Sequence, residues 1–116
     1  MIEGGYHGHD KNVELHYRAV DAVNRRDLDS LLALGMRVWW KTLLEAFPDF
    51  TIEVSAVRDH GDVTVAALHN RGHGADSDAP FEQMTWQAVR WRRGMCIWWC
   101  TVQSQAEALE AVGLSE

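Results

Sequence analysis

The chain has 116 residues and a formal net charge of −6, and 47% of its residues are hydrophobic. This length suits a single domain over residues 1–116, with one modest core. An acidic chain with scattered arginines is poorly suited to hold nucleic acid or anionic lipid, so we expect neither partner. No apolar run reaches the roughly 18 residues of a membrane helix, and the first five residues do not resemble a secretory signal. These features predict a cytoplasmic protein.

The two cysteines agree with that prediction. Cys96 and Cys100 lie four residues apart in a predicted strand, so their Cα atoms should be roughly 13 Å apart. A disulfide needs these atoms within about 7 Å, which predicts two reduced, mostly buried thiols. A single Cys-x3-Cys pair is a weak zinc signal, and we expect neither a metal nor a cofactor.

Apolar residues recur every three or four positions from Asn12 to Leu34, which predicts a helix. The expected apolar face consists of Val13, Tyr17, Val20 and Val23. Residues 24–27 interrupt the pattern, and Asp27 is a good N-cap for a second short turn from Leu28 to Leu34. Gly35 then permits a left-handed stop.

The next helix is predicted from about Met36 to Phe47, and Pro48 ends it. Its expected buried stripe consists of Met36, Trp40, Leu43, Leu44 and Phe47. Such spacing places apolar side chains along one side of a helix.

Four strands are predicted next, because apolar and polar residues alternate with a period of two. They run from Phe50 to Val57, Val63 to Arg71, Phe81 to Arg92 and Met95 to Gln103, and a helix from Ala106 to Val112 follows. Short turns between sequential strands predict an antiparallel meander.

Several segments carry a resemblance to one family. Residues 35–50 read Gly-Met-Arg-Val-Trp-Trp-Lys-Thr-Leu-Leu-Glu-Ala-Phe-Pro-Asp-Phe, and residues 12–28 and 106–114 have matching helical patterns. Together they resemble the SnoaL-like polyketide cyclases, which share the cone fold of ketosteroid isomerases and nuclear-transport-factor-like proteins. The resemblance implies an α+β fold. In it, a curved antiparallel or mixed sheet is wrapped by about three helices around a central pocket for a small apolar molecule.

One segment departs from the family order. Family members usually carry Tyr-x-Gly-His-Asp-Gly directly before the Arg-x-Trp-Trp helix, whereas here residues 6–10, Tyr-His-Gly-His-Asp, precede the first helix. Joining Asp10 to Gly35 would restore that order, and one strand of the family pattern is missing after the first helix. Residues 1–10 are therefore a displaced or flexible loop segment, or a leader that matches by chance. A missing strand would leave an exposed edge, which favours dimerisation or segment exchange.

The resemblance also implies where the chemistry of the cyclases would lie. Their aspartate on the last strand falls on Thr101, and their histidine on the preceding strand falls on Gln87. Neither side chain can exchange a proton usefully near neutral pH, which puts cyclase activity in doubt. We expect both to bind ligand, together with Trp39, Trp40, Tyr6 and His9. Alternatively, Gln87 and Thr101 form a hydrogen bond with each other across the sheet and have no binding role.

Other titratable residues allow two interpretations each. His69, Arg71 and His73 share one face of a strand, either as an acid/base or anion-holding row or as a solvated outer face. Glu82 begins the next strand and would be a base only if buried. His69 and Glu82 are thus the weak catalytic candidates.

Three residues near the N-terminus, His7, His9 and Asp10, look like a metal trio. Without further ligands a helix cap at Asp10 is the better interpretation. His16, on the first helix, is interpreted as structural.

The six tryptophans suggest a partner. Trp98 and Trp99 should point to opposite faces of the last strand, so both faces must be covered. Because large aromatics are enriched in interfaces, and family members are commonly dimers through this sheet, we expect a homodimer.

Three functions stay open. The first is binding of a small apolar molecule, or cofactor-independent proton transfer as in isomerases, aldol cyclases or epoxide hydrolases of this fold. The second is a non-catalytic dimeric interaction module with a filled pocket, and the third is a rearranged domain without retained activity.

Overall fold

The structure, a computed structural model, describes residues 8–36 and 40–114, without the side chains of residues 8–10, 40, 41 and 43. The helices are α1 (Gly8–Asn24), α2 (Leu28–Ala33), α3 (Trp40–Ala46) and α4 (Gln105–Ala111). The strands are β2 (Thr51–His60), β3 (Val63–His73), β4 (Pro80–Arg92) and β5 (Met95–Val102). Among the described residues, no helix is both long and apolar enough to cross a membrane.

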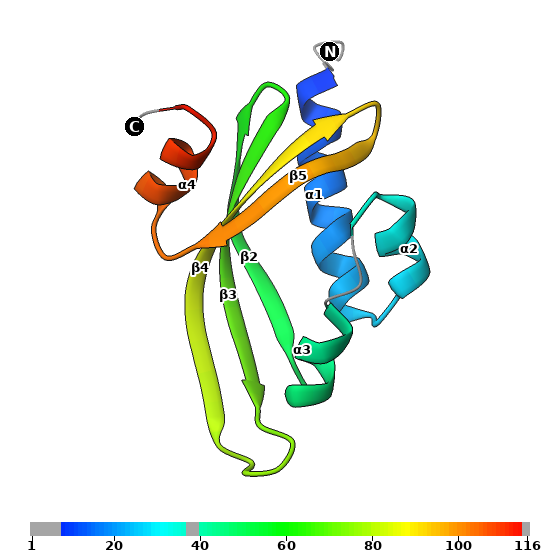
Figure 1. The fold of residues 1–116 in the computed structure, drawn as a ribbon, viewed down its shortest axis with the longest axis vertical. Helices are drawn as coiled ribbons and strands as arrows, with labels where there is room; N and C mark the ends of the chain where they lie inside the picture. Colours follow the sequence, from blue (N-terminus) through cyan, green and yellow to red (C-terminus); the bar gives the residue numbers. More distant parts are fainter. Residues whose placement is uncertain (1–7, 37–39, 115–116) are drawn as a thin grey trace.

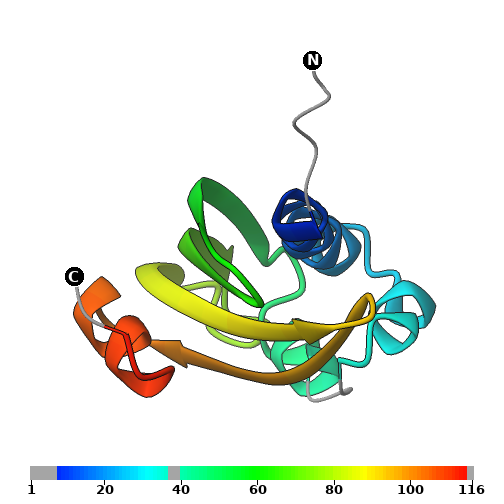
Figure 2. The ribbon, with the colours of Figure 1, turned by 90° about the horizontal axis from the view of Figure 1, so that it is seen from above.

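The four strands form one curved antiparallel sheet in the order β2-β3-β4-β5. Helices α1, α2 and α3 lie on one side of this sheet, which we call the inner face, and α4 lies on the outer face (Figures 1 and 2). The fold is therefore α+β with an antiparallel meander, as the strand patterns predict. Four helices are described rather than about three, because Asp27 caps α2 as a helix of its own by accepting from the backbone N–H of Ser30.

The first helix differs from its prediction in start and in phase. It begins at Gly8, inside the segment expected to be a loop, and four residues before the predicted start at Asn12. Its buried side chains are His16, Ala19, Val20, Ala22 and Val23. Tyr17, expected on the apolar face, is 47% exposed. Ala19, Ala22 and His16 thus lie on the face of α1 that packs against the sheet.

The end of α2 packs closely against β5. The backbone N–H of Cys96 donates to the carbonyl of Leu34 at 2.6 Å. Gly35 has a φ of +84°, and a Cβ at this position would lie 2.8 Å from the carbonyl oxygen of Cys96. Only glycine combines this positive φ with so close an approach. The predicted left-handed stop at Gly35 is thus confirmed, and it holds α2 beside the sheet.

Two hydrophobic clusters lie on the two faces of the sheet. The inner cluster joins α1 and α2 to the strands, and includes Val23, Leu31, Met36, Leu68 and Val89. The outer cluster lies under α4 and comprises Val63, Val65, Ala88, Ala108 and Leu109. Because α4 covers only part of the outer face, the remainder of that face is open to solvent.

Candidate functional site

Gln87 and Thr101 lie directly opposite each other in the β4–β5 register, and both belong to the inner face. Gln87 is only 2% exposed, whereas Thr101 is exposed. The side-chain oxygen of Gln87 bonds to His16 on α1 rather than to Thr101. The structure therefore places both predicted residues on the inner face of the sheet, Gln87 buried and Thr101 exposed.

Gln87 is the last member of a buried chain of hydrogen bonds. The indole N–H of Trp91 donates to Thr64 Oγ1 at 2.9 Å. Thr64 Oγ1 lies 2.7 Å from His16 Nδ1, and His16 Nε2 lies 2.8 Å from Gln87 Oε1. All four side chains are at most 2% exposed. Such a network in a low-dielectric interior rigidifies its members when all are satisfied.

Burial sets the protonation state of His16. Removal of the ring from water lowers the pKa of His16 from 6.5 to about 4, although the bond to Gln87 opposes this shift. At neutral pH the imidazole is therefore uncharged, with one donor and one acceptor nitrogen. His16 also packs edge-on to Trp91, with ring centroids 6.3 Å apart.

A small void adjoins this chain. It has a volume of about 10 Å³ and is lined by Gln87 and by the apolar side chains of Ala19, Val20, Val23, Met36 and Ile52. A void of this size is at the lower limit for one water molecule. A larger ligand would have to displace neighbouring side chains, and Met36 is the most adaptable of them.

More polar groups follow along the inner face. Asn70 donates to Thr85 Oγ1 at 2.9 Å, and Gln83 donates to Gln103 at 3.2 Å. Near them the rings of Phe47 and Phe81 pack with centroids 4.9 Å apart. The inner face thus combines aromatic surface with a few fixed polar groups, as small-ligand sites do.

The weak catalytic candidates meet on the other side of the sheet. His69 Nε2 bonds to a carboxylate oxygen of Glu82, and Glu53 Oε1 lies 3.7 Å from His69 Nδ1 and 3.0 Å from Arg71 Nη2. Glu82 and Arg71 are exposed. This is a solvated charge cluster on the outer face, with the sheet between it and Gln87.

The third member of the predicted row has a separate partner. His73 Nδ1 bonds to Asp49 at 2.7 Å, and this pair raises the pKa of His73 and lowers the pKa of Asp49. Both side chains are about half exposed, so the pair ties the end of β3 to the α3–β2 junction at the surface.

Several residues that were predicted to bind ligand lie outside the part of the chain that the structure describes. Tyr6 and Trp39 are outside the described residues, and the side chains of His9 and Trp40 are too. Within the described part of the chain, no group of three His, Cys, Asp or Glu residues is placed to hold a metal ion.

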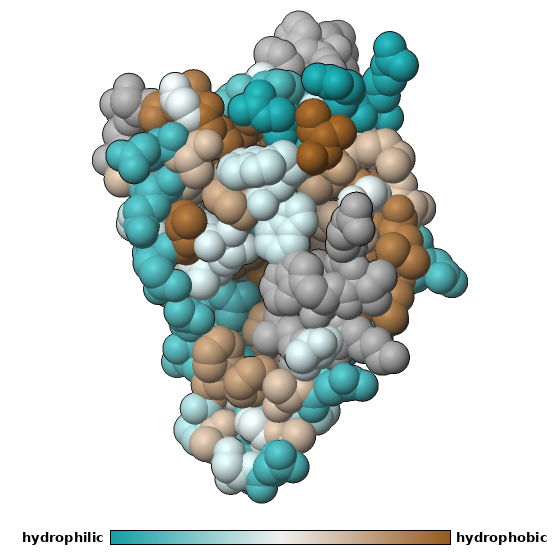
Figure 3. Space-filling view, in the orientation of Figure 1, coloured by the Kyte–Doolittle hydropathy of each residue, from teal (hydrophilic) through white to brown (hydrophobic). Residues whose placement is uncertain are grey.

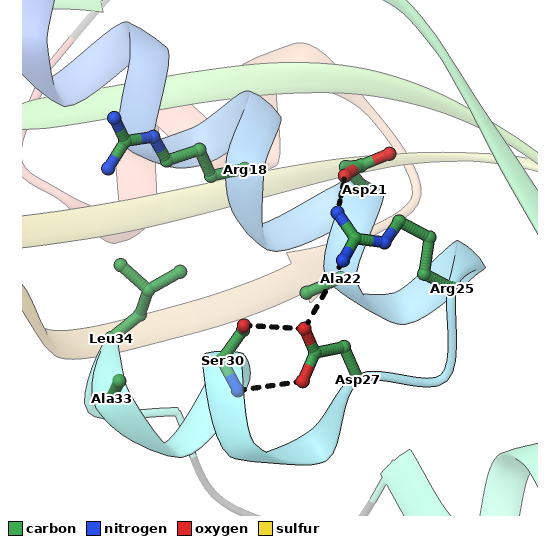
Figure 4. Close-up of a pocket in the computed structure, with 8 residues that line it drawn as sticks. All are labelled: Arg18, Asp21, Ala22, Arg25, Asp27, Ser30, Ala33 and Leu34. Carbon is green, nitrogen blue, oxygen red and sulfur yellow. Dashed lines mark hydrogen bonds and ion pairs between the residues drawn. The ribbon is translucent and has the colours of Figure 1, made fainter.

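Two surface grooves run along α1 at a distance from Gln87. One, of about 360 Å³, lies between α1 and α2, and Figure 4 shows its polar wall, where Arg25 lies between Asp21 and Asp27. The other, of about 450 Å³, lies between α1 and the β4–β5 turn. Arg18 lines both and is paired with Glu14 at 2.9 Å. The polar groups of the α1–α2 wall mostly pair with one another.

His16 is the residue whose role the sequence interpretation missed. The sequence alone indicates a structural residue and names no partner for it. The available signal was its spacing of four and seven residues from Val20 and Val23, which places it on the buried side of the helix. Its contact with Gln87, 71 residues away, could not be inferred without the strand register.

No protein-family model and no curated protein matches the chain. Solved structures do match. The wild-type IdmH of Streptomyces antibioticus, a candidate polyketide cyclase, is 20% identical with a TM-score of 0.68, over 93% of this chain and 100% of that one. AclR of Streptomyces galilaeus, a candidate hydroxylase, is 16% identical with a TM-score of 0.73, over 90% and 96%. A candidate SnoaL-like polyketide cyclase from Jannaschia is 17% identical with a TM-score of 0.62, over 79% and 85%.

The chain has the SnoaL-like cone fold. This confirms the fold that residues 12–28, 35–50 and 106–114 imply. In the cone, the inner face that carries Gln87 and Thr101 is the concave wall. Neighbours at this level of identity establish the fold, and chemistry must be argued from the site itself.

Proposed function

We propose that this SnoaL-like domain binds a small, largely apolar molecule against the inner face of its sheet. Gln87 is the polar anchor, and the exposed Thr101 lies opposite it on the same face. The candidate polyketide cyclases among the neighbours favour a ring-containing, polyketide-like or terpenoid-like compound.

One observation carries this proposal. Gln87 Oε1 is occupied by His16, and the amide nitrogen of Gln87 has no hydrogen-bond partner within the described residues. The void beside it is otherwise lined by apolar side chains. A ligand acceptor placed against this nitrogen would add a hydrogen bond at an otherwise apolar surface.

Binding is better supported than acid/base catalysis. Gln87 and Thr101 do not titrate near neutral pH, and both ring nitrogens of His16 are engaged in hydrogen bonds. A positioned acid or base contributes roughly 10²–10⁴-fold to a rate, and none is described at this wall. The cyclases, isomerases and hydrolases of this fold therefore remain the less favoured candidates.

The test is a titration with 1-indanone, a neutral bicyclic ketone, followed through the NMR signals of the Gln87 side-chain amide. We expect a saturable shift, and roughly tenfold weaker binding in Gln87→Met because the donor is lost. Gln105→Met is the matched control, since it makes the same change in α4, on the other side of the sheet. Absence of any shift, or shifts confined to the α1 grooves around Arg18, would contradict the proposal.

The same compound separates binding from catalysis. The protons beside its carbonyl exchange with deuterium when a base abstracts them. We expect the protein to leave this exchange at its rate in buffer. A hundredfold acceleration that disappears in Gln87→Met would establish the enzyme instead.

A second candidate function has its own observation. The void lined by described residues, about 10 Å³, holds no ligand larger than water without rearrangement. A cone with a filled interior would act as a non-catalytic interaction module. Failure of 1-indanone and related compounds to bind at Gln87 would favour this function.

We also propose a cytoplasmic homodimer that uses the outer face of the sheet. Trp98 is 40% and Met84 42% exposed there. Among the described residues on the face drawn in Figure 3, hydrophobic surface is broken into small areas between polar residues. Free Cys96 and Cys100 agree with a reducing compartment.

A further inference from the structure

The buried hydrogen-bond chain behind Gln87 has a direction that follows from the donor capacity of each member. Trp91 Nε1 can only donate, so Thr64 Oγ1 accepts at 2.9 Å. The hydroxyl hydrogen of Thr64 then needs an acceptor, and His16 Nδ1 lies 2.7 Å away. Among the described partners of Thr64, this nitrogen is the one that can accept.

The direction continues through the ring of His16. A neutral imidazole that accepts at Nδ1 carries its proton at Nε2. His16 Nε2 therefore donates to Gln87 Oε1 at 2.8 Å. The lowered pKa of the buried ring agrees with this uncharged tautomer.

The reverse direction satisfies fewer groups. If His16 Nδ1 carried the proton, Thr64 Oγ1 would accept from both Trp91 and His16, and its own hydrogen would have no acceptor among the described partners. A buried donor left unpaired in this way is unfavourable. The chain thus has one well-satisfied direction, from Trp91 to Gln87.

We infer that this chain fixes the Gln87 side chain as a pure donor toward the cone interior, so that the site selects ligands with a hydrogen-bond acceptor, such as a ketone or ester carbonyl. His16 and Thr64 are positioning residues, because they act on the ligand through Gln87. The inference deepens the proposed function and rests on it.

The same geometry states which ligands are rejected. A glutamine free to rotate its amide can present either its oxygen or its NH₂ group, and would accept ligand donors and acceptors alike. Here the oxygen is held by His16, and the other lining side chains of the void offer no strong acceptor. A ligand N–H group would therefore face the Gln87 N–H donors with no partner.

The first measurement needs no ligand. The ¹⁵N NMR spectrum of the His16 ring at neutral pH should show a neutral ring with the proton on Nε2. A proton on Nδ1, or a charged ring, would overturn the inference whatever binds.

The second measurement compares 1-indanone, indole and indane, which have similar shapes and offer an acceptor, a donor and neither group. In the native protein we expect 1-indanone to bind roughly tenfold tighter than indole. In Thr64→Val, which keeps the side-chain shape and leaves Gln87 intact, the ratio should fall toward one because the amide is free to turn. His16→Phe should give the same loss of selectivity, and guards against failure of either variant to fold.

The outcomes separate the two claims. Indole binding at Gln87 as tightly as 1-indanone, or selectivity unchanged in a folded Thr64→Val or His16→Phe variant, overturns the inference and leaves the proposed function standing. If none of the three compounds binds at Gln87, the proposed function is wrong and the inference is wrong with it.

Discussion

At the scale of single residues, His16 determines how the interior responds to acid. Its pKa is lowered to about 4 in the folded state, whereas an unfolded histidine titrates near 6.5. Between these values the unfolded chain binds a proton that the folded protein does not. The contribution of the uncharged His16 to the free energy of unfolding should therefore be at its maximum above about pH 6.5. It should fall by about 3 kcal/mol as the pH drops to about 4.

Urea unfolding at pH 7 and pH 4 measures this loss. Asp27, Asp49 and His73 also have shifted pKa values. The native protein must therefore be compared with His16→Phe, because the contributions of these three residues are the same in both proteins and cancel in the difference. The native protein should lose about 3 kcal/mol more than the variant. Equal losses would mean that His16 titrates normally, and an NMR titration of its ring would show this directly if the variant does not fold.

At the scale of elements, Asn24 joins the end of α1 to the start of β2. Its side chain donates to the carbonyl of Ile52 at 2.9 Å and accepts from the N–H of Ile52 at 2.8 Å. Asn24→Ala would leave both backbone groups unpaired, and we expect a loss of roughly 2–4 kcal/mol in the free energy of unfolding.

The matched control for this change is also on α1. Asn12 makes one bond, to the carbonyl of Gly61 at 3.2 Å, so Asn12→Ala should cost about 1 kcal/mol or less. The urea midpoints of the two variants, compared at an unchanged m-value, measure both losses of stability. If the Asn24 variant is no less stable than the Asn12 variant, the two hydrogen bonds between Asn24 and Ile52 do not contribute to stability as predicted.

Element types could be predicted better than their phase. Alternation from Phe50 to Val57 identified β2, although the strand extends to His60 and only two residues separate it from β3 at Val63. The four-strand order followed from short connections. The phase of α1 was ambiguous in the sequence, because the spacing from Val20 fits both His16 and Tyr17, and only the packing of the helix against the sheet decides which of the two is buried.

At the scale of the whole molecule, the candidate site was predictable in part. The resemblance placed Gln87 and Thr101 on the inner face, and the register confirms that they lie opposite each other. It could not reveal that Gln87 is held from behind by His16, Thr64 and Trp91. Those contacts join residues 27 to 71 positions apart, and exist only once α1 lies across the sheet.

The proposed homodimer is tested at this scale. Sedimentation equilibrium at micromolar concentration should give twice the chain mass of 13.2 kDa. Trp98→Lys should give the chain mass because it places a charge in the expected interface. Leu32, 51% exposed on α2 at the other side of the sheet, offers Leu32→Lys as the control. A native protein that sediments as a monomer would remove the dimer from the account.

The most direct test of the central claim is a crystal structure of the protein soaked with 1-indanone. We expect the carbonyl oxygen of the ketone about 2.7–3.2 Å from the Gln87 amide nitrogen. His16 should still be bonded to Gln87 Oε1, and Met36 displaced to make room. A ketone bound only in the grooves along α1, or an interior unchanged around its void, would contradict the account.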